Sequence, residues 1–492
     1  MRRLLALGLG CFASFSASSE DLLTIFDQAV VNDPTVREAE FARKATREAK
    51  PQAWAAYLPQ INGSYNKGES EGNQLTQDAN VIPDVNNPGS FILQRYADNS
   101  SPSPEFSGWN LELRQTIFNW GGLVALKQSS RIAAQADADY GVAQQDLAIR
   151  VATRYFDVLA ALDNVQAQQA SLDAISRQLE QADKRFEVGL IAITDVQEAR
   201  AARDTAAADL IAAKRQYATS QELLREITDM QYASLSVPRG TMPLAVPEPA
   251  DPQKWVEASM EQNLALSSSR LGAEIARDDV RTAFGGHLPS VDLVVGKSHS
   301  ERADVKDFPP EPGFGGGSAP STQDSDTDKS ITLQVQVPIW SSGGTHSRVK
   351  QSEYRWQAAK QRVERTSRET ERLARDAYLG VMSEISRVQA LQQALESSRT
   401  SLKATEAGYD VGTRTAIDVL AARQALVRAY TDFSRSRYDY MLNVLRLKQA
   451  AGLLDRKALE EVNTWLEAAA PGAPTVSPDI APNIAPTPPP AQ

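Results

Sequence analysis

Two tracts without proline limit the folds open to this chain. The sequence of 492 residues contains 26 prolines, but none lies between Pro104 and Pro238 or between Pro338 and Pro471. Because proline breaks the interior of a helix, its absence over such lengths predicts very long helices. Residues 122–186, as one helix, would extend roughly 95 Å at about 1.5 Å per residue. A compact domain has no room for that helix, so the sequence predicts a rod of helical coiled coils.

The two tracts are copies of one pattern. FEVGLIAITDV, from Phe186 to Val196, returns as YDVGTRTAIDV, from Tyr409 to Val419, at an offset of 223 residues. The same offset relates further pairs along the tracts: Tyr155 and Tyr378, Gly189 and Gly412, Asp195 and Asp418, Arg200 and Arg423, and Tyr217 and Tyr440. An internal repeat of this kind predicts a duplicated helical hairpin.

The repeat and the proline-rich segments predict how the chain is divided. We expect a signal peptide at residues 1–19, a first structural repeat at 20–236, a linker at 237–252, a second repeat at 253–467, and a disordered tail rich in proline and alanine at 468–492. Each repeat would contain helices plus two β-strands.

The first residues resemble an export signal. Arg2 and Arg3 precede an apolar stretch that ends at small residues near Ala17, which is typical of a secretory leader too short to span a membrane. The single cysteine, Cys11, lies inside this segment, so cleavage would leave no thiol for a disulfide or a metal. An alternative stays open, because residues 8–11 loosely match a lipoprotein box in which Cys11 would be lipidated.

Short segments with alternating polarity predict strands. Residues 109–114 and 331–337 alternate between apolar and polar side chains, and residues 61–65 and 291–293 follow the same style. One apolar and one polar face is the pattern of a strand between lipid and water. The long polar connections, 67–107 and 299–329, are expected to be solvent loops. Aromatic residues near the predicted ends of these strands suggest a membrane-interface girdle: Tyr57, Tyr65, Trp109, Phe118, Trp120 and Trp340.

Four strands are too few to stand alone in a membrane. The smallest membrane barrels have about eight strands, and lipid does not tolerate the open edges of a sheet. Several chains must therefore pool their strands, so the sequence predicts a homo-oligomer without fixing the number of subunits.

Several classes of function find no support in the sequence. The formal net charge of −10 gives no electrostatic footprint for nucleic acid. The three histidines, His287, His299 and His346, lie far from other ligands in sequence, so neither a metal site nor a cofactor is predicted. No nucleophile and base stand in a catalytic arrangement, and we expect no enzyme.

Four motifs, in order along the chain, carry a resemblance to a known family. They are DQAVVNDPTVREAE, RFEVGLIAITDVQEAR, GYDVGTRTAIDVL and RYDYMLNVLRLKQAAGLL. Over residues 20–465 the chain resembles the TolC family of outer-membrane channel-tunnels, in particular the channels of type I secretion. The resemblance implies a fold that is mainly α with β: a homotrimer in which four strands per chain close a transmembrane β-barrel of twelve strands, continued by a long helical coiled-coil barrel in the periplasm.

The same resemblance implies a place and partners. The protein would lie in the bacterial outer membrane, in contact with outer-membrane lipid and with a large periplasmic portion. It would act as an exit duct recruited by an inner-membrane transporter of the ABC or RND type and by a periplasmic adaptor, or membrane fusion, protein. The exported substrate is not encoded in a duct of this kind.

The repeated phrase predicts two helix tips. Gly189 and Gly412 would each end a helix in a left-handed cap, and Asp195 and Asp418 would lie in the first turn of the next helix, near the positive end of its dipole. The spacing from Thr415 to Asp418 also fits a capping box.

The resemblance implies that these tips form a gate at the periplasmic entrance. Tyr409 would bond Asp195, Glu406 would meet Gln178, and Arg414 would reach the region of Thr194 and Asp195 in a neighbouring chain.

Asp418 would then project into the pore as a ring of carboxylates at the constriction. The family has a second acid one turn later, where this chain has Ala421, so the ring of charge should be thinner and cation selectivity weaker.

Three functions compete. An exit duct is favoured, serving type I protein export or, alternatively, a multidrug efflux pump. A soluble periplasmic coiled-coil scaffold is disfavoured by the alternating strands, and an enzyme by the missing catalytic constellation.

Overall fold

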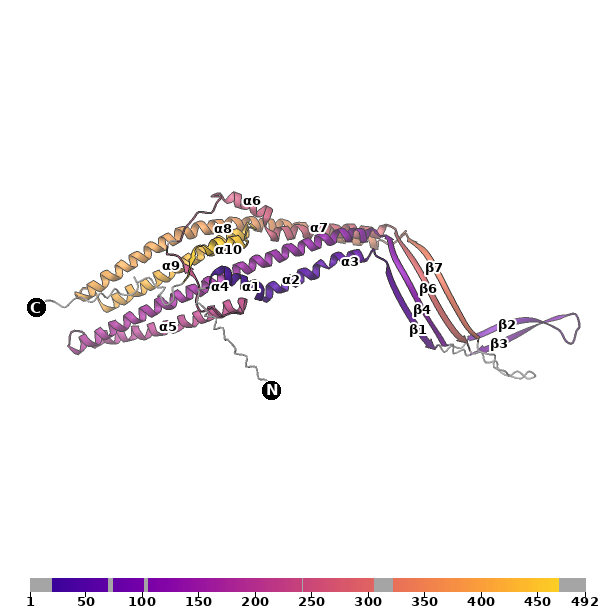
Figure 1. Ribbon diagram of the computed structural model, residues 1–492, viewed down its shortest axis with the longest axis horizontal. Helices are drawn as coiled ribbons and strands as arrows, with labels where there is room; N and C mark the ends of the chain where they lie inside the picture. Colours follow the sequence, from indigo (N-terminus) through magenta and orange to yellow (C-terminus); the bar gives the residue numbers. More distant parts are fainter. Residues whose placement is uncertain (1–19, 70–73, 101–104, 241, 305–321, 469–492) are drawn as a thin grey trace, which may run out of the picture. The chain divides into compact units, whose positions relative to one another are not determined.

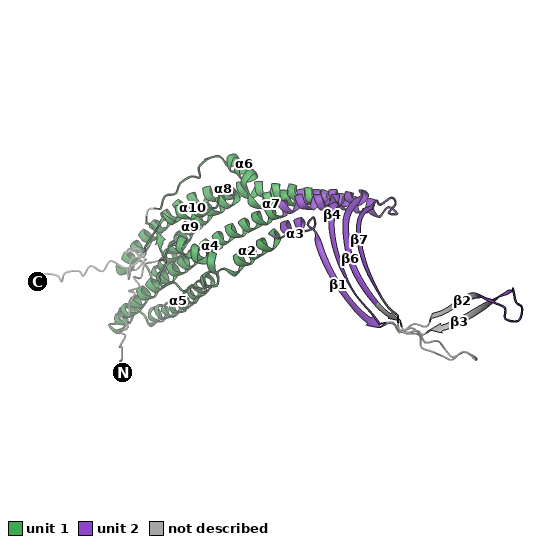
Figure 2. Cartoon of the chain, turned by 45° about the vertical axis from the view of Figure 1, so that its right-hand side comes forward, with its two compact units in different colours: residues 1–47, 133–273, 358–492 green, residues 48–132, 274–357 purple. Residues whose placement is uncertain are grey.

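A computed structural model describes residues 20–69, 74–100, 105–240, 242–304 and 322–468. The predicted leader with Cys11, and the predicted tail beyond residue 468, lie outside these residues. The chain divides into two compact units, one of residues 1–47, 133–273 and 358–492, and the other of residues 48–132 and 274–357 (Figure 2). Units defined by contacts and repeats defined by sequence are different divisions, and the repeat boundaries stay a prediction.

Long helices run through the structure, as the two tracts without proline predict (Figure 1). The longest are α4, Trp120–Glu187, with 68 residues, and α8, Gly344–Asp410, with 67 residues. Each is followed by a shorter antiparallel partner, α5 at Ile193–Thr228 and α9 at Ala416–Ala450. The prediction of one helix over residues 122–186 is confirmed. None of the described helices has a stretch long and apolar enough to cross a membrane.

Shorter elements complete the helical unit. They are α1 (Leu22–Asn32), α2 (Pro34–Arg47), α6 (Pro252–Gln262), α10 (Arg456–Asn463), β5 (Val237–Pro238), β8 (Leu466–Glu467) and the first part of α7 (Leu264–Phe284), whose residues 274–284 belong to the other unit. The core of this unit lies where α4 and α9 pack together. Phe156 stacks on Tyr438 with ring centroids 5.7 Å apart, and the fully buried Tyr155 donates a hydrogen bond of 2.6 Å to the carbonyl oxygen of Ser236. Tyr155 and Tyr378 are both buried, as expected for core residues.

The other unit holds an antiparallel sheet of four strands in the order β1-β4-β6-β7. The strands are β1 (Gln60–Glu69), β4 (Glu105–Phe118), β6 (Ser290–Asp304) and β7 (Thr322–Gln336). Helix α3 (Ala49–Ala55) leads into β1, and a 3-10 turn (Gly285–His287) leads into β6. Three of the four predicted strand segments lie within these strands, and the fourth, 331–337, extends one residue beyond the end of β7.

The predicted solvent loops are wrong in part, because much of each predicted loop is strand. Residues 67–69 and 105–107 belong to β1 and β4, and residues 299–304 and 322–329 extend β6 and β7. Between β1 and β4, a further hairpin pairs β2 (Gln74–Pro83) with β3 (Phe91–Ser100). The strand ladder depends on backbone hydrogen bonds, so it continues where the side chains turn polar and the alternating pattern that reveals a strand disappears.

Candidate functional site

One face of the four-stranded sheet is apolar. Residues paired across neighbouring strands point to the same face, and the next residue along points to the other. One row across the sheet joins Ile331, Val295, Leu113 and Ile61, and the next row on this face joins Leu333 to Leu293. Ile331 is 80% exposed and Leu333 63% exposed, so this face is uncovered in the single chain.

The opposite face is polar and linked across strands. Between the two apolar rows lies a row that joins Thr332, Val294, Arg114 and Gln60. The Arg114 guanidinium lies 3.4 Å from the Asp292 carboxylate, and the Thr116 hydroxyl donates a hydrogen bond of 2.9 Å to the same carboxylate. These side chains suit contact with water, whereas those of the other face do not.

Aromatic side chains mark one end of the apolar face. Tyr65 pairs with Trp109, which pairs with His299, and the rings of Trp109 and His299 lie 6.2 Å apart. From Trp109 to Phe118 the strand rises about 30 Å, which gives a band of about 23 Å when strands tilt by roughly 40°. This height is close to the apolar band of about 25 Å on outer-membrane strands, so the dimensions and polarity of the sheet suit a membrane wall.

The two predicted tips lie at the ends of the helical hairpins. Helix α4 ends at Glu187 and Gly189 has φ of +77°, while α8 ends at Asp410 and Gly412 has φ of +80°. A side chain other than glycine rarely adopts these values. The polypeptide then starts α5 and α9, which run back along the helix that each follows (Figure 1).

The starts of α5 and α9 are capped differently. Thr415, the N-cap of α9, accepts a hydrogen bond from the Asp418 backbone N–H at 3.2 Å, and its own N–H donates to the Asp418 carboxylate at 2.9 Å. These bonds from the backbone and hydroxyl of Thr415 lower the pKa of Asp418. Ala192, the N-cap of α5, provides no side-chain hydrogen bond. Two copies of one motif thus differ in local stability.

The ends of α4 and α8 meet through Arg185. Its guanidinium lies 5.2 Å from the centre of the Tyr409 ring and 3.8 Å from the Asp410 carboxylate. Within the described residues no hydrogen bond joins Tyr409 to Asp195, and the predicted bond between them stays a prediction. Arg414 and Thr194 are both exposed, so the side chains predicted to link neighbouring chains are accessible in the single chain.

Glu406 and Gln178 lie in a partly buried polar region. Glu406 forms an ion pair with Arg423 of α9, while both polar side-chain atoms of Gln178 are buried without a hydrogen-bond partner. The predicted contact of Glu406 with Gln178 therefore stays a prediction. Sequence reasoning gave Arg423 no role, although its alignment with Arg200 in the repeat was a signal that could have drawn attention to it.

Both tips carry exposed apolar side chains. Val188 is 69% exposed and Leu190 74% exposed on one tip, and Val411 is 75% exposed on the other. Exposed apolar groups clustered at an end of a molecule are typical of a contact surface. No group of three or more metal-ligating side chains lies close together among residues with described positions.

Comparisons with known proteins agree with this arrangement. The model of the family described as outer membrane efflux protein matches residues 25–228 and 255–453. Outer membrane protein TolC of Vibrio cholerae is 34% identical over 474 residues, covering 95% of this chain and 100% of the relative. TolC of Escherichia coli is 32% identical, with coverage of 94% and 88%. The alkaline protease secretion protein AprF of Pseudomonas aeruginosa is 28% identical, with coverage of 94% and 91%.

Solved structures show the same fold at low identity. A structure of CusC aligns with a TM-score of 0.69 at 16% identity over 88% of this chain and 92% of that one. The outer membrane protein VceC of Vibrio cholerae aligns with a TM-score of 0.67 at 18% identity over 88% of this chain and 96% of that one. With a sequence match that spans both halves, the chain belongs to the TolC family of outer membrane efflux proteins.

Proposed function

We propose that this protein is the outer-membrane exit duct of a type I secretion system, in which a homotrimer carries protein substrates past a gate formed by the helix tips. The observation that carries the proposal is the four-stranded sheet with one exposed apolar face and one polar face. In water the apolar face of such a sheet would be exposed, and in lipid the backbone groups at its two edges would have no hydrogen-bond partners. The sheet therefore needs other copies of itself and a membrane around them.

The edges of the sheet support assembly. Within the described residues, β1 pairs only with β4 and β7 only with β6, so each chain offers two edges for pairing. Three chains would close a barrel of twelve strands, above the minimum of about eight. The apolar face would contact lipid, and Arg114 and Asp292 would line the water-filled interior.

The tips support a gate that opens reversibly. Exposed ion pairs contribute only about 0–1 kcal/mol each, so links from Tyr409, Glu406 and Arg414, repeated by symmetry, would hold the tips closed without locking them. A periplasmic adaptor that binds the exposed Val188, Leu190 and Val411 would compete with those links. Inside the gate, the three Asp418 carboxylates would attract cations at the narrowest point.

Protein export is favoured over drug efflux by the names of two relatives. AprF is described as an alkaline protease secretion protein, and PrtF of Dickeya chrysanthemi, 22% identical over 460 residues, as a proteases secretion protein. The efflux alternative is supported by BepC of Brucella suis, an outer membrane efflux protein 22% identical over 452 residues. Deleting the gene in its host separates the two: we expect a protein to vanish from the culture medium, whereas unchanged secretion with increased drug sensitivity would favour efflux.

A pair of lysine substitutions tests the membrane wall. Ile331→Lys places a charge on the apolar face, where lysine costs about 2–4 kcal/mol in the middle of the bilayer, while Thr332→Lys places the same charge on the polar face. We expect Ile331→Lys to reduce the amount of heat-resistant trimer extracted from outer membranes at least fivefold and Thr332→Lys to leave it nearly unchanged. Equal loss in both variants, or a wild-type protein that is a monomer released by salt alone, would refute the proposal.

A further inference from the structure

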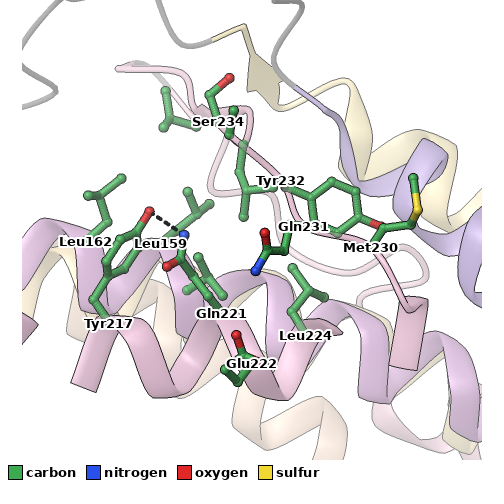
Figure 3. Close-up of a pocket in the computed structure, with 14 residues that line it drawn as sticks. Leu159, Leu162, Tyr217, Gln221, Glu222, Leu224, Met230, Gln231, Tyr232 and Ser234 are labelled. Carbon is green, nitrogen blue, oxygen red and sulfur yellow. Dashed lines mark hydrogen bonds between the residues drawn. The ribbon is translucent and has the colours of Figure 1, made fainter. Parts of the chain in front are cut away.

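A cavity in the helical unit is not used by the proposed channel function. Its volume is about 360 Å³, and it lies between α4, α5 and the extended segment that follows α5. Leu159 and Leu162 contribute from α4, Tyr217 and Gln221 from α5, and Tyr232 from the extended segment (Figure 3). The cavity is partly open to solvent, so a segment of chain has access to it.

The lining combines aromatic rings with amide groups. The Gln221 side-chain amide donates a hydrogen bond of 3.0 Å to the Tyr217 hydroxyl, and the Tyr232 hydroxyl donates one of 2.5 Å to the Gln28 side chain. These bonds fix the two rings in the wall. Grooves lined by aromatic rings are surfaces on which extended proline-rich segments bind.

The direction of strand β8 leads the proline-rich segment that follows it towards this cavity. Strand β8 runs antiparallel to β5, with Glu467 paired to Val237 and Leu466 to Pro238. A chain that leaves Glu467 in the strand direction therefore runs back along Ser236 towards Ser234, and both Ser234 and Val237 line the cavity. The next residues of the sequence, 468–492, contain eight prolines together with Val476, Ile480 and Ile484.

We propose that the proline-rich C-terminal segment of the same chain, residues 469–492, occupies the cavity lined by Tyr217 and Tyr232. Length is no obstacle, because even the nine residues from Glu467 to Val476 reach about 30 Å when extended. Prolines reduce the conformational freedom that binding would remove, and the apolar side chains between them fill the space beside Leu159 and Leu162. The proposal is independent of the channel function.

Disulfide formation tests the position of the segment. In a Cys11→Ser background, Val476→Cys is combined either with Ser234→Cys, in the cavity wall, or with Gly240→Cys. Ser234 and Gly240 lie three residues from Val237 in opposite directions, and a side chain at Gly240 meets no atom within 4 Å. A freely moving segment would reach both equally. We expect the Ser234 pair to form a disulfide within one chain at least tenfold faster.

Two outcomes of this experiment would overturn the proposal. Equal rates for the two pairs would mean that the segment has no preferred side. A disulfide that joins two chains, detected as a dimer on a non-reducing denaturing gel, would place the segment of a second copy in the cavity instead.

A synthetic peptide provides an independent measurement on the trimer in detergent. The peptide of residues 469–492 should bind a protein that ends at residue 468 and bind the full-length protein at least tenfold more weakly, because the cavity is already filled. Tyr217→Ala in the truncated protein should weaken binding at least fivefold, whereas Tyr217→Phe, which keeps the ring, should not. Failure of the peptide to bind the truncated protein would overturn the proposal.

Discussion

Asp418 caps the start of α9 and is the residue proposed to form the pore constriction. Its carboxylate accepts hydrogen bonds from both the backbone and the hydroxyl of Thr415, and these bonds lower its pKa. A carboxyl with a lowered pKa stays ionised as the pH falls through the range where an ordinary aspartate takes up a proton. Any charge effect of Asp418 should therefore persist in mildly acidic solution.

We predict that Asp418→Ala reduces the cation preference of the channel. The permeability ratio of potassium to chloride, from the reversal potential across a planar bilayer under a salt gradient, should fall at least twofold, and the wild-type ratio should be nearly the same at about pH 5 as at pH 7. Thr415→Ala is the matched control, because it breaks the same cap but keeps the carboxylate. A reversal potential unchanged by Asp418→Ala would place the constriction elsewhere.

The pKa of a second aspartate, Asp163, is shifted in the opposite direction. Burial between α4 and α9 raises the pKa of Asp163 to about 6, although the Tyr438 hydroxyl, which donates a hydrogen bond of 2.7 Å to the carboxylate, and the nearby Arg437 oppose the rise. The folded protein therefore holds this proton more tightly than the unfolded chain. The stability that results is complete below the ordinary aspartate pKa and is lost as the pH rises to about 6.

We predict that Asp163→Asn, which resembles the neutral acid, raises the thermal midpoint at pH 8 by about 2 °C or more and leaves it nearly unchanged at pH 4. Asp173 is an exposed residue on the same helix, and Asp173→Asn should have equal, small effects at both values. A gain from Asp163→Asn that does not depend on pH would mean that removal of a buried charge is not its cause.

At the scale of elements, the helices were predictable and the full strands were not. The absence of proline predicted long helices in both tracts, because one forbidden residue type constrains every position of a helix, and the predicted helix over residues 122–186 lies within α4. The outer parts of β6 and β7 carry polar residues on both faces, such as Asp326 and Thr327, so their alternation gave no signal. Contacts such as Glu406 with Arg423, and the cavity beside Tyr217 and Tyr232, depend on packing between elements, which no local pattern encodes.

Glycines at the ends of helices allow a prediction at this scale. Gly412 has φ of +80° and free space where a side chain would lie, whereas Gly452, with φ of +75°, would place a Cβ only 2.3 Å from the carbonyl oxygen of Gln262. Gly412→Ala should cost about 1–2 kcal/mol from the backbone alone, and Gly452→Ala should cost more because the backbone of α6 must also shift. Thermal unfolding of the purified protein measures both, and equal losses would contradict this order.

For the whole molecule, the proposed gate includes a contact that forms only in an assembly, the one from Arg414 to a neighbouring chain. Tyr409 lies in the last turn of α8 and Arg414 on the tip that follows this helix, and Arg414 is exposed in the single chain. Each link is weak, so the closed state would depend on repetition around the symmetry axis. The loss of several links at once should therefore have a much larger effect on conductance than the loss of one.

We predict that the double variant Tyr409→Phe and Arg414→Ser raises the single-channel conductance in a planar bilayer at least twofold. Lys184→Ser is a suitable control, because Lys184 pairs with Glu180 one turn away on its own helix and has no role in the links. A conductance that matches the wild-type value in the double variant would remove the proposed latch.

The unequal caps of α5 and α9 have a consequence for how such an entrance would loosen. Thr415 and Asp418 keep the first turn of α9 wound, while the first turn of α5, behind Ala192, lacks such a side-chain bond. In a trimer each chain would contribute two tips, one that leads into α5 and one that leads into α9. The three α9 tips would resist fraying, and the three α5 tips between them would fray readily. Amide hydrogens of Thr194 and Asp195 would then exchange with solvent sooner than those of their counterparts in α9, and dilation would start at every second tip.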